Sequence, residues 1–275
     1  MLLNAGIIGG STAWTPAKLT TAFWAKASDS DTLFDATSGG SLPAADGEIA
    51  RLEDKSGNAR HLTQSASGSR PIRKVSLING RDVMRLDGTN DALRMANQGE
   101  IARSVGAFMI FATFNTTGGD STRRAVFRVS VSNSARSRAG LWATSTGVEA
   151  GGRRLDADAF QSVTASGTGW VLGSAILDYS GANLQVGVNG AYVNLSGGFQ
   201  TAGNTSNTAS DNVYVGANED SSNMELFGGD IHEIVAIRSS LLSTDDREKL
   251  EGYMLHEIGL AANLPSGHPY KTVAP

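Results

Sequence analysis

The sequence predicts an all-β fold in which two antiparallel layers stack on one another, with a single helix near the carboxyl end. Short apolar segments recur along most of the chain and are separated by polar turns. Glycine accounts for 33 of the 275 residues, without a collagen-like period, which suits many tight turns. Only one segment, in the last quarter, has a strong helical pattern. One domain of this class commonly reaches about 200–250 residues, so the length does not require two domains.

The amino-terminal stretch is expected to form an arm, because its first residues are apolar and rich in glycine. Such an arm either anchors the domain to a neighbouring protein or packs back onto its own domain. Pro16 to Lys26 follows with Leu19, Phe23 and Trp24 at helical spacing, which predicts a short helix or turn over one end of the sandwich. We divide the chain into an arm, one domain and a tail: residues 1–20, 21–262 and 263–275.

Two early strands are predicted to end in polar turns. Ile49–Glu53 is the first clear strand, and Asp54–Asn58 closes it because glycine and asparagine accept positive φ. Asp82–Leu86 is the next strand, followed by a turn at Asp87–Asp91. The candidate calcium ligands in these turns are Asp54, Asp87 and Asp91. Calcium takes about six to eight oxygens, more than one short turn supplies, so we expect these side chains to cap their own turns and expect no cofactor.

The middle of the chain reads as a series of strands. Ala107–Phe114 is an almost unbroken apolar run, typical of a strand that is buried on both faces. The Asn189-Gly190 pair between two later segments is a strong hairpin signal. Residues 153–169 and 196–211 lack periodicity and are predicted to be loops at the ends of the sandwich, where binding residues usually lie. The later strands are predicted at Ala125–Val131, Gly140–Ala143, Gly147–Ala150, Trp170–Asp178, Asn183–Val188, Ala191–Leu195 and Asn212–Ala217.

The last quarter combines a strand with the helix. On a regular strand over Ile231–Ile237, Glu233 lies on one face with Ile231, and Asp230 and His232 lie on the other. Ser243 is a good N-cap, and two aspartates place negative charge in the first turn of the helix that follows. An apolar stripe and a glycine stop complete the helix: Leu250, Tyr253, Met254, Ile258 and Gly259.

Two blocks of the sequence resemble a known family. The carboxyl-terminal block is G-D-I-x-E-I from Gly229, followed by LEGYMLHEIGL and NLPSGHPYK. The upstream block is D-x-S-G-N-x-x-x-x-x-Q from Asp54, then R-P, N-G and D-G-x-x-D-x-L up to Leu93. Together they are similar to concanavalin A-like jelly-roll domains of the laminin-G-like type, which occur in bacterial surface proteins and in bacteriophage tail and fibre proteins.

The resemblance implies a two-layer antiparallel jelly-roll sandwich for most of the chain. It implies less about function, because this sandwich carries lectins, hydrolases and purely structural parts alike. A related branch, the laminarinase-like glycosidases, carries E-x-D-x-x-E on a strand, since retaining cleavage needs two carboxyls about 5 Å apart. The comparable stretch here runs from Gly228 to Glu233 and lacks the first glutamate. We therefore expect no enzymatic activity.

Other catalytic or metal-binding patterns are also missing from the sequence. Cysteine is absent, and no G-x-S-x-G, P-loop or strand-linked G-x-G-x-x-G occurs. The histidines are scattered and show no zinc-binding spacing: His61, His232, His256 and His268. No metal site is expected beyond the weak calcium candidates.

A cluster of arginines stands out in a chain of formal charge −4. Between residues 120 and 154 there are seven arginines against two acids. Arginine suits phosphate and carboxylate through its planar fork, so one reading is a contact with lipopolysaccharide phosphate or a neighbouring subunit. The other reading is a set of solvated hairpins. The candidate ligand-binding arginines are Arg123, Arg124, Arg136 and Arg138, and the remaining three are Arg128, Arg153 and Arg154.

A sugar site would use an exposed aromatic ring as a stacking platform. The candidates for this role are Trp142, Tyr179 and Phe160. Each of them is also a candidate core residue, because large aromatic side chains dominate the interiors of sandwiches.

The composition and the first residues indicate which partners and which cellular compartment to expect. An isoelectric point near 5.6 argues against a dedicated nucleic-acid binder. The first ten residues lack the cationic start of a secretory signal, and no apolar stretch approaches the roughly 18 residues of a membrane span. A chain without cysteine folds without an oxidising compartment, so we expect it to be made in a bacterial cytoplasm.

We therefore predict a non-enzymatic virion surface protein, associated with a phage tail or fibre, whose lectin-like domain recognises a host-surface glycan. The arm would contact other virion proteins, and we expect a homo-oligomer without nucleic acid or membrane insertion. Two alternatives stay open. One is a structural virion subunit, such as a capsid decoration or tail-assembly protein. The other is a cellular carbohydrate-binding module or glycosidase.

Overall fold

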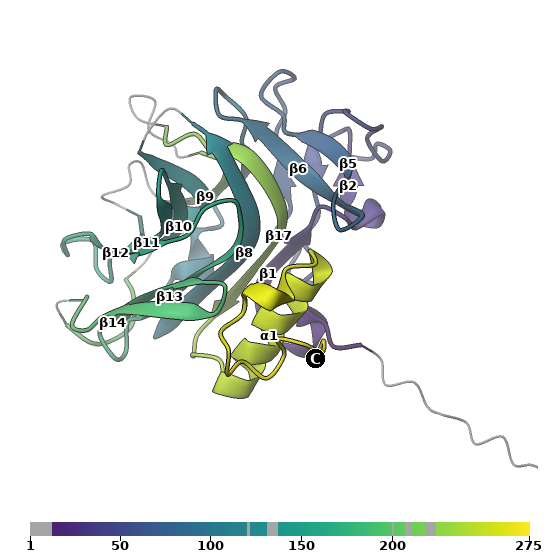
Figure 1. Ribbon diagram of the computed structural model, residues 1–275. Coiled ribbons are helices and arrows are strands. Elements are labelled where there is room, and N and C mark those ends of the chain that lie inside the picture. Colours follow the sequence, from purple (N-terminus) through teal and green to yellow (C-terminus); the bar gives the residue numbers. More distant parts are fainter. Residues whose placement is uncertain (1–12, 120–121, 131–136, 200, 207–210, 218–223) are drawn as a thin grey trace, which may run out of the picture.

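The computed structural model describes residues 13–119, 122–130, 137–199, 201–206, 211–217 and 224–275. These residues form two stacked antiparallel sheets, with one α-helix lying against the outer face of the first sheet (Figure 1). The predicted two-layer sandwich with a single carboxyl-terminal helix is confirmed. In the described part of the chain, no helix is long and apolar enough to cross a membrane.

Sheet A carries the helix. Its order is β15 (Ala191–Leu195), β14 (Asn183–Val188), β13 (Trp170–Asp178), β8 (Ala107–Gly118), β17 (Gly228–Arg238), β6 (Arg81–Asp87) and β5 (Ile72–Ile78), with β1 (Thr21–Lys26) paired to β17. Sheet B has the order β12 (Gln161–Ser166), β11 (Gly147–Gly152), β10 (Ala139–Thr144), β9 (Arg123–Ser130), β16 (Asn212–Val215), β7 (Leu93–Met95), β4 (Leu62–Thr63), β3 (Arg51–Leu52) and β2 (Leu33–Phe34). Short 3-10 helices lie at Pro16–Lys18, Ser30–Thr32, Gly99–Ala102 and Ala261–Asn263.

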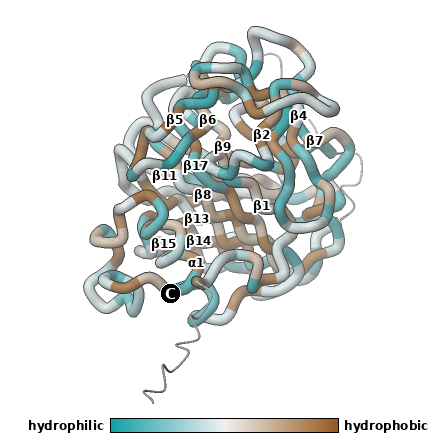
Figure 2. The backbone as a smooth tube through the Cα atoms, turned by 90° about the vertical axis from the view of Figure 1, so that its right-hand side faces the viewer, coloured by the Kyte–Doolittle hydropathy of each residue, from teal (hydrophilic) through white to brown (hydrophobic). Residues whose placement is uncertain are grey.

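The main core lies between the sheets, and a second apolar cluster lies between sheet A and the helix. β8 contributes to both, because Phe108 and Ile110 point between the sheets while Met109 and Phe111 point toward the helix. This alternation explains the unbroken apolar run in the sequence. Hydrophobic segments accordingly gather in the crossing strands at the centre of Figure 2, and hydrophilic ones in the loops.

The helix α1 (Thr244–Glu257) begins and ends where the sequence predicts. The Ser243 side chain accepts a hydrogen bond from the backbone of Asp246, at 3.1 Å. Gly259, just past the end, adopts a φ of +71°, which a residue with a side chain rarely does. The tail packs back on the helix at Gly252, where an added Cβ would lie 2.4 Å from the Cβ of Tyr270.

Two local predictions were wrong in part, and one strand was not predicted. Pro16–Lys26 is not a helix beyond its first turn, because Thr21–Lys26 pairs with β17 as β1. That pairing outweighs the helical spacing of the apolar residues. The stretch 153–169 contains β12, and β5 lies in a region for which we predicted no strand. The beginning of the predicted arm, residues 1–12, lies outside the described residues.

Candidate functional site

A bulge in β17 determines which side chains reach the outer face of sheet A. The pairing of β17 with β8 shifts by one residue between Ile231 and Glu233, which leaves His232 as an extra residue. Ile231 then points into the main core, while Glu233 joins Asp230 and His232 on the outer side. The prediction that Glu233 faces away from these two residues was wrong, because it assumed a regular strand.

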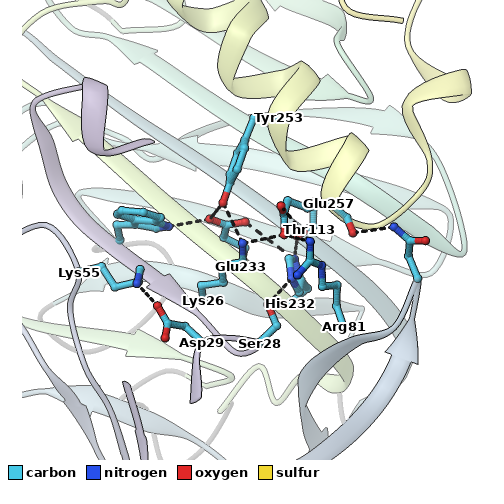
Figure 3. A network of polar contacts seen from close by, with 12 residues as sticks. Lys26, Ser28, Asp29, Lys55, Arg81, Thr113, His232, Glu233, Tyr253 and Glu257 are labelled. Atoms are coloured by element: carbon cyan, nitrogen blue, oxygen red, sulfur yellow. Dashed lines mark hydrogen bonds and ion pairs between the residues drawn. The ribbon is translucent and has the colours of Figure 1, made fainter. Parts of the chain in front are cut away.

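Glu233 is the centre of a polar network under α1 (Figure 3). The indole Nε1 of Trp24 donates to Glu233 Oε1 at 2.6 Å, and the Tyr253 hydroxyl donates to the same oxygen at 3.3 Å. Lys26 donates to the Tyr253 hydroxyl at 2.9 Å and to the Glu257 carboxylate at 2.7 Å. The network therefore ties β1, β17 and α1 together.

Burial shifts the two titratable groups of the bulge toward their neutral forms. Glu233 is 1% exposed, and its burial raises its pKa to about 7, against the attraction of Lys26. His232, also 1% exposed, has its pKa lowered to about 3 by burial and by the charges of Lys26 and Arg81. Its ring nitrogens contact the hydroxyls of Ser28, at 3.0 Å, and Thr113, at 3.3 Å.

A cavity of about 330 Å³ lies beside this network but does not expose the bulge. Its lining includes Lys26, Lys55 and Arg81, and each of these cations is paired with a carboxylate of Asp29 or Glu257. Neither Glu233 nor His232 lines it. The network therefore holds α1 against sheet A. A molecule in the cavity would contact cations that are already paired with carboxylates.

Sheet B has a comparable network on its own outer face. The indole Nε1 of Trp142 donates to Glu225 Oε2 at 2.8 Å, and Arg128 donates to the same oxygen at 2.9 Å. Arg128 is 0% and Glu225 1% exposed. Arg128 also donates to the hydroxyls of Ser130 and Ser137.

Three of the seven arginines in the predicted cluster are buried, so these three neither form a contact surface for an acidic partner nor lie on solvated hairpins. Arg138 is buried and donates to the backbone carbonyl oxygens of Arg153 and Arg154 and to Asp156, which fixes the start of the loop after β11. Arg128 and Arg153 are buried as well. Arg124 is half-buried, and Arg136 lies outside the described residues. The count of charges along the sequence could not show that loops cover these side chains.

Two of the three predicted stacking platforms are also buried. Trp142 and Tyr179 have no exposed surface, so neither ring can stack on a sugar. The Tyr179 hydroxyl donates to the Arg138 carbonyl at 2.5 Å. Phe160 is half-buried and packs edge-on against Trp142, with ring centroids 5.8 Å apart.

An open groove remains around Arg123, and we call it the Arg123 groove. It has a volume of about 420 Å³. The Arg123 guanidinium forms a two-point contact with the Glu149 carboxylate and lies over the rings of Phe160 and Trp142, at 5.0 and 5.5 Å. Hydroxyl groups surround this pair: Thr122, Thr144, Ser145, Thr146, Thr164 and Ser166. Of the candidate ligand-binding residues, Arg123 is the one that the structure places in a groove, with Trp142 beneath it.

The three calcium candidates accept hydrogen bonds from backbone N–H groups in or beside their own turns. Asp54 accepts hydrogen bonds from the backbone of Trp24 and Arg60, at 3.0 and 3.1 Å, and so joins β1 to its turn. Asp87 accepts from three backbone N–H groups of its turn. Asp91 accepts from the Asp87 backbone at 3.0 Å, and burial raises its pKa to about 6. Among the described residues, no three His, Asp or Glu side chains are grouped to hold a metal.

Comparison with known proteins supports the architecture. No family model and no curated protein matches the chain. Among solved structures, the binding domain of paraclostridial mosquitocidal protein 1 has a TM-score of 0.56 at 10% identity over 86% of this chain. The botulinum neurotoxin serotype D binding domain has 0.55 at 11% identity over 86%. Its complex with N-acetylneuraminic acid has 0.52 at 12% identity over 84%. The chain spans about half the length of these domains, 52%, 51% and 50%, and shares with them a concanavalin A-like sandwich.

Proposed function

We propose that the chain is a lectin-like domain that binds saccharides in the Arg123 groove. The observation that carries this proposal is the Arg123–Glu149 pair, held over two aromatic rings and surrounded by hydroxyls. A fixed guanidinium donates to neighbouring sugar hydroxyls while a fixed carboxylate accepts from them. Prealigned groups of this kind favour a hydroxyl-rich ligand over an apolar one.

The fold gives independent support. The serotype D binding domain, which shares the sandwich, has been solved in complex with N-acetylneuraminic acid. From that protein we carry over the ligand class, a saccharide, and not the position of the site. The identity of 12% is too low to match residues one by one.

We infer binding without turnover. A retaining glycosidase needs two accessible carboxyls about 5 Å apart. Glycine stands at position 228, where the laminarinase-like pattern has its first glutamate, and Glu233 is enclosed by Trp24 and Tyr253. Asp230 is held by a two-point ion pair with Arg85, at 2.7 and 2.9 Å.

For the biological setting, we propose a virion surface role in attachment to a host glycan. Support comes from the sequence resemblance to phage tail and bacterial surface domains. The structural virion subunit remains the second candidate, and the copy number on a purified particle separates them. A few copies at one site favour attachment, whereas hundreds over a shell favour decoration.

The test is a glycan array followed by titration calorimetry, with and without calcium. Thr164→Trp places an indole in the Arg123 groove from an exposed position on β12 and leaves the ion pair intact. Ser162→Trp is the matched control, because it shares the strand and face of Thr164 without lining the groove. We expect Thr164→Trp to weaken saccharide binding at least about tenfold, which is about 1.4 kcal/mol, and Ser162→Trp to leave it unchanged. Equal binding by both variants, or no saccharide bound by the wild type, contradicts the proposal.

A further inference from the structure

A second groove lies on the outer face of sheet B, around Arg94, and we call it the Arg94 groove. Its volume is about 460 Å³. Arg94 lies between the buried core residues Leu93 and Met95 on β7, so its side chain points outward. In the sheet register, Arg94 is flanked by Thr63 of β4 and Tyr214 of β16, which also line the groove.

The charge of Arg94 is not paired with any carboxylate of the described residues. Within the described part of the chain, no carboxylate forms an ion pair with its exposed guanidinium, whereas Arg123 and Arg128 on the same sheet are paired with glutamates. Among the described residues that line the groove, Arg94 is the one cationic side chain and none is acidic. The groove therefore offers a planar fork of N–H donors to an incoming oxyanion.

The rest of the lining limits the kind of oxyanion. Asn90, Ser65 and Ser69 provide amide and hydroxyl groups on one side. Met224 and Ala217 form an apolar wall that continues into a small buried cluster. A ligand that fits all three parts combines an anion, several hydroxyls and an apolar patch. One guanidinium matches the single charge of a carboxylate better than the nearly double charge of a phosphate monoester.

We propose that the Arg94 groove binds the carboxylate of an acidic saccharide, with the Arg94 fork contacting both carboxylate oxygens. This assignment rests on the proposed saccharide binding for its ligand class but uses a separate site. The two grooves are neighbours, because Met224 lines the Arg94 groove and the next residue, Glu225, lines the Arg123 groove.

The experiment uses NMR titration of the full chain with two probes, N-acetylneuraminic acid and methyl glucuronoside, at millimolar concentration. The methyl ester of each probe and inorganic phosphate serve as comparison ligands. The variants are Arg94→Gln, which removes the charged fork, and Arg94→Lys, which keeps the charge without the fork. Arg103→Gln is the matched control, because this half-buried arginine lines neither groove.

We expect at least one acid to bind the wild type and its ester to bind much more weakly. Arg94→Gln should weaken acid binding about 10–100-fold, the usual effect of losing a charged hydrogen bond, with a smaller loss for Arg94→Lys and none for Arg103→Gln. Acid binding by Arg94→Gln as tight as by the wild type overturns the proposal, and so does binding of neither acid. Phosphate binding as tight as that of the acid overturns the ligand class.

The two sites are separated by the Thr164→Trp variant. If Thr164→Trp still binds the acid while Arg94→Gln does not, the Arg94 assignment stands even where the Arg123 groove fails. Suppose that the wild type binds neutral saccharides, that Thr164→Trp does not, and that Arg94→Gln binds acids as tightly as the wild type. The proposed function then stands and the Arg94 assignment fails.

Discussion

Each sheet of the sandwich buries a tryptophan–glutamate pair on its outer face, and the two pairs have different chemistry. Glu233 on sheet A accepts from Trp24 and Tyr253, two neutral donors, and burial raises its pKa to about 7. Glu225 on sheet B accepts from Trp142 and also pairs with Arg128 at 2.9 Å. The comparison shows that the neighbours of a buried carboxylate decide its role: Glu233 is mainly a hydrogen-bond acceptor, and Glu225 is a counter-ion.

The two outer faces differ in access as well. On sheet A, α1 and the Glu233 network cover the centre of the face, and the charged side chains in the adjacent cavity are paired with one another. On sheet B, two neighbouring grooves stay open on either side of the segment that carries Glu225. This difference supports our proposal that ligands bind to the outer face of sheet B, whereas the centre of the outer face of sheet A holds α1 in place.

The largest effect is expected from Glu225→Gln. This change leaves the Arg128 guanidinium, which is 0% exposed, without its counter-ion. Breaking a buried pair in this way costs about 3–5 kcal/mol, measured as a loss in the free energy of unfolding in urea. Glu149→Gln is the control, because its partner Arg123 is 28% exposed, and a smaller loss is expected. Equal losses for the two variants would contradict the distinction between the fully buried Arg128–Glu225 pair and the partly exposed Arg123–Glu149 pair.

Glu233→Gln is expected to have the next largest effect, and its sign depends on pH. The native state keeps the Glu233 proton up to about pH 7, whereas the unfolded chain releases it near the ordinary value of 4.5. The stability that this group contributes is therefore full below pH 4.5 and is lost as the pH rises to about 7. Glutamine stays neutral and keeps the acceptor, so the variant should gain on the order of 3 kcal/mol over the wild type across this range.

Denaturant unfolding of both proteins at a series of pH values measures this difference. His232 contributes with the opposite sign, since its lowered pKa makes stability fall as the pH drops from 6.5 to about 3. Because both proteins retain His232, its contribution cancels in the comparison. A constant difference between wild type and Glu233→Gln from pH 4 to 8 would mean that burial does not raise the pKa of Glu233.

Ser243→Ala should give the smallest effect. It removes the cap of α1, which costs about 1 kcal/mol, and the loss appears in the free energy of unfolding. The helix covers the Glu233 network on the outer face of sheet A, so saccharide binding on sheet B should not change. Weaker saccharide binding by Ser243→Ala, with the protein still folded, would place the binding face under α1.

Much of the fold could be predicted from local sequence signals. The cap at Ser243 and the Asn189-Gly190 turn, whose φ angles are 50° and 79°, are set by residues close together in the chain. The bulge at His232 has no such signal, because it arises from pairing with β8, more than a hundred residues away. The sequence left open whether the arginines contact an acidic partner or lie on solvated hairpins, but the partner of Arg128 lies 97 positions away and Arg138 is buried. Distant pairing and loop cover therefore limited the prediction of the site.

A crystal structure of the chain with the best-binding saccharide from the array tests the central claim most directly. We predict the saccharide on the outer face of sheet B, with hydroxyls on the Arg123–Glu149 pair and, for an acidic sugar, a carboxylate on Arg94. A saccharide bound on the outer face of sheet A beside α1, with both grooves of sheet B empty, would contradict the account.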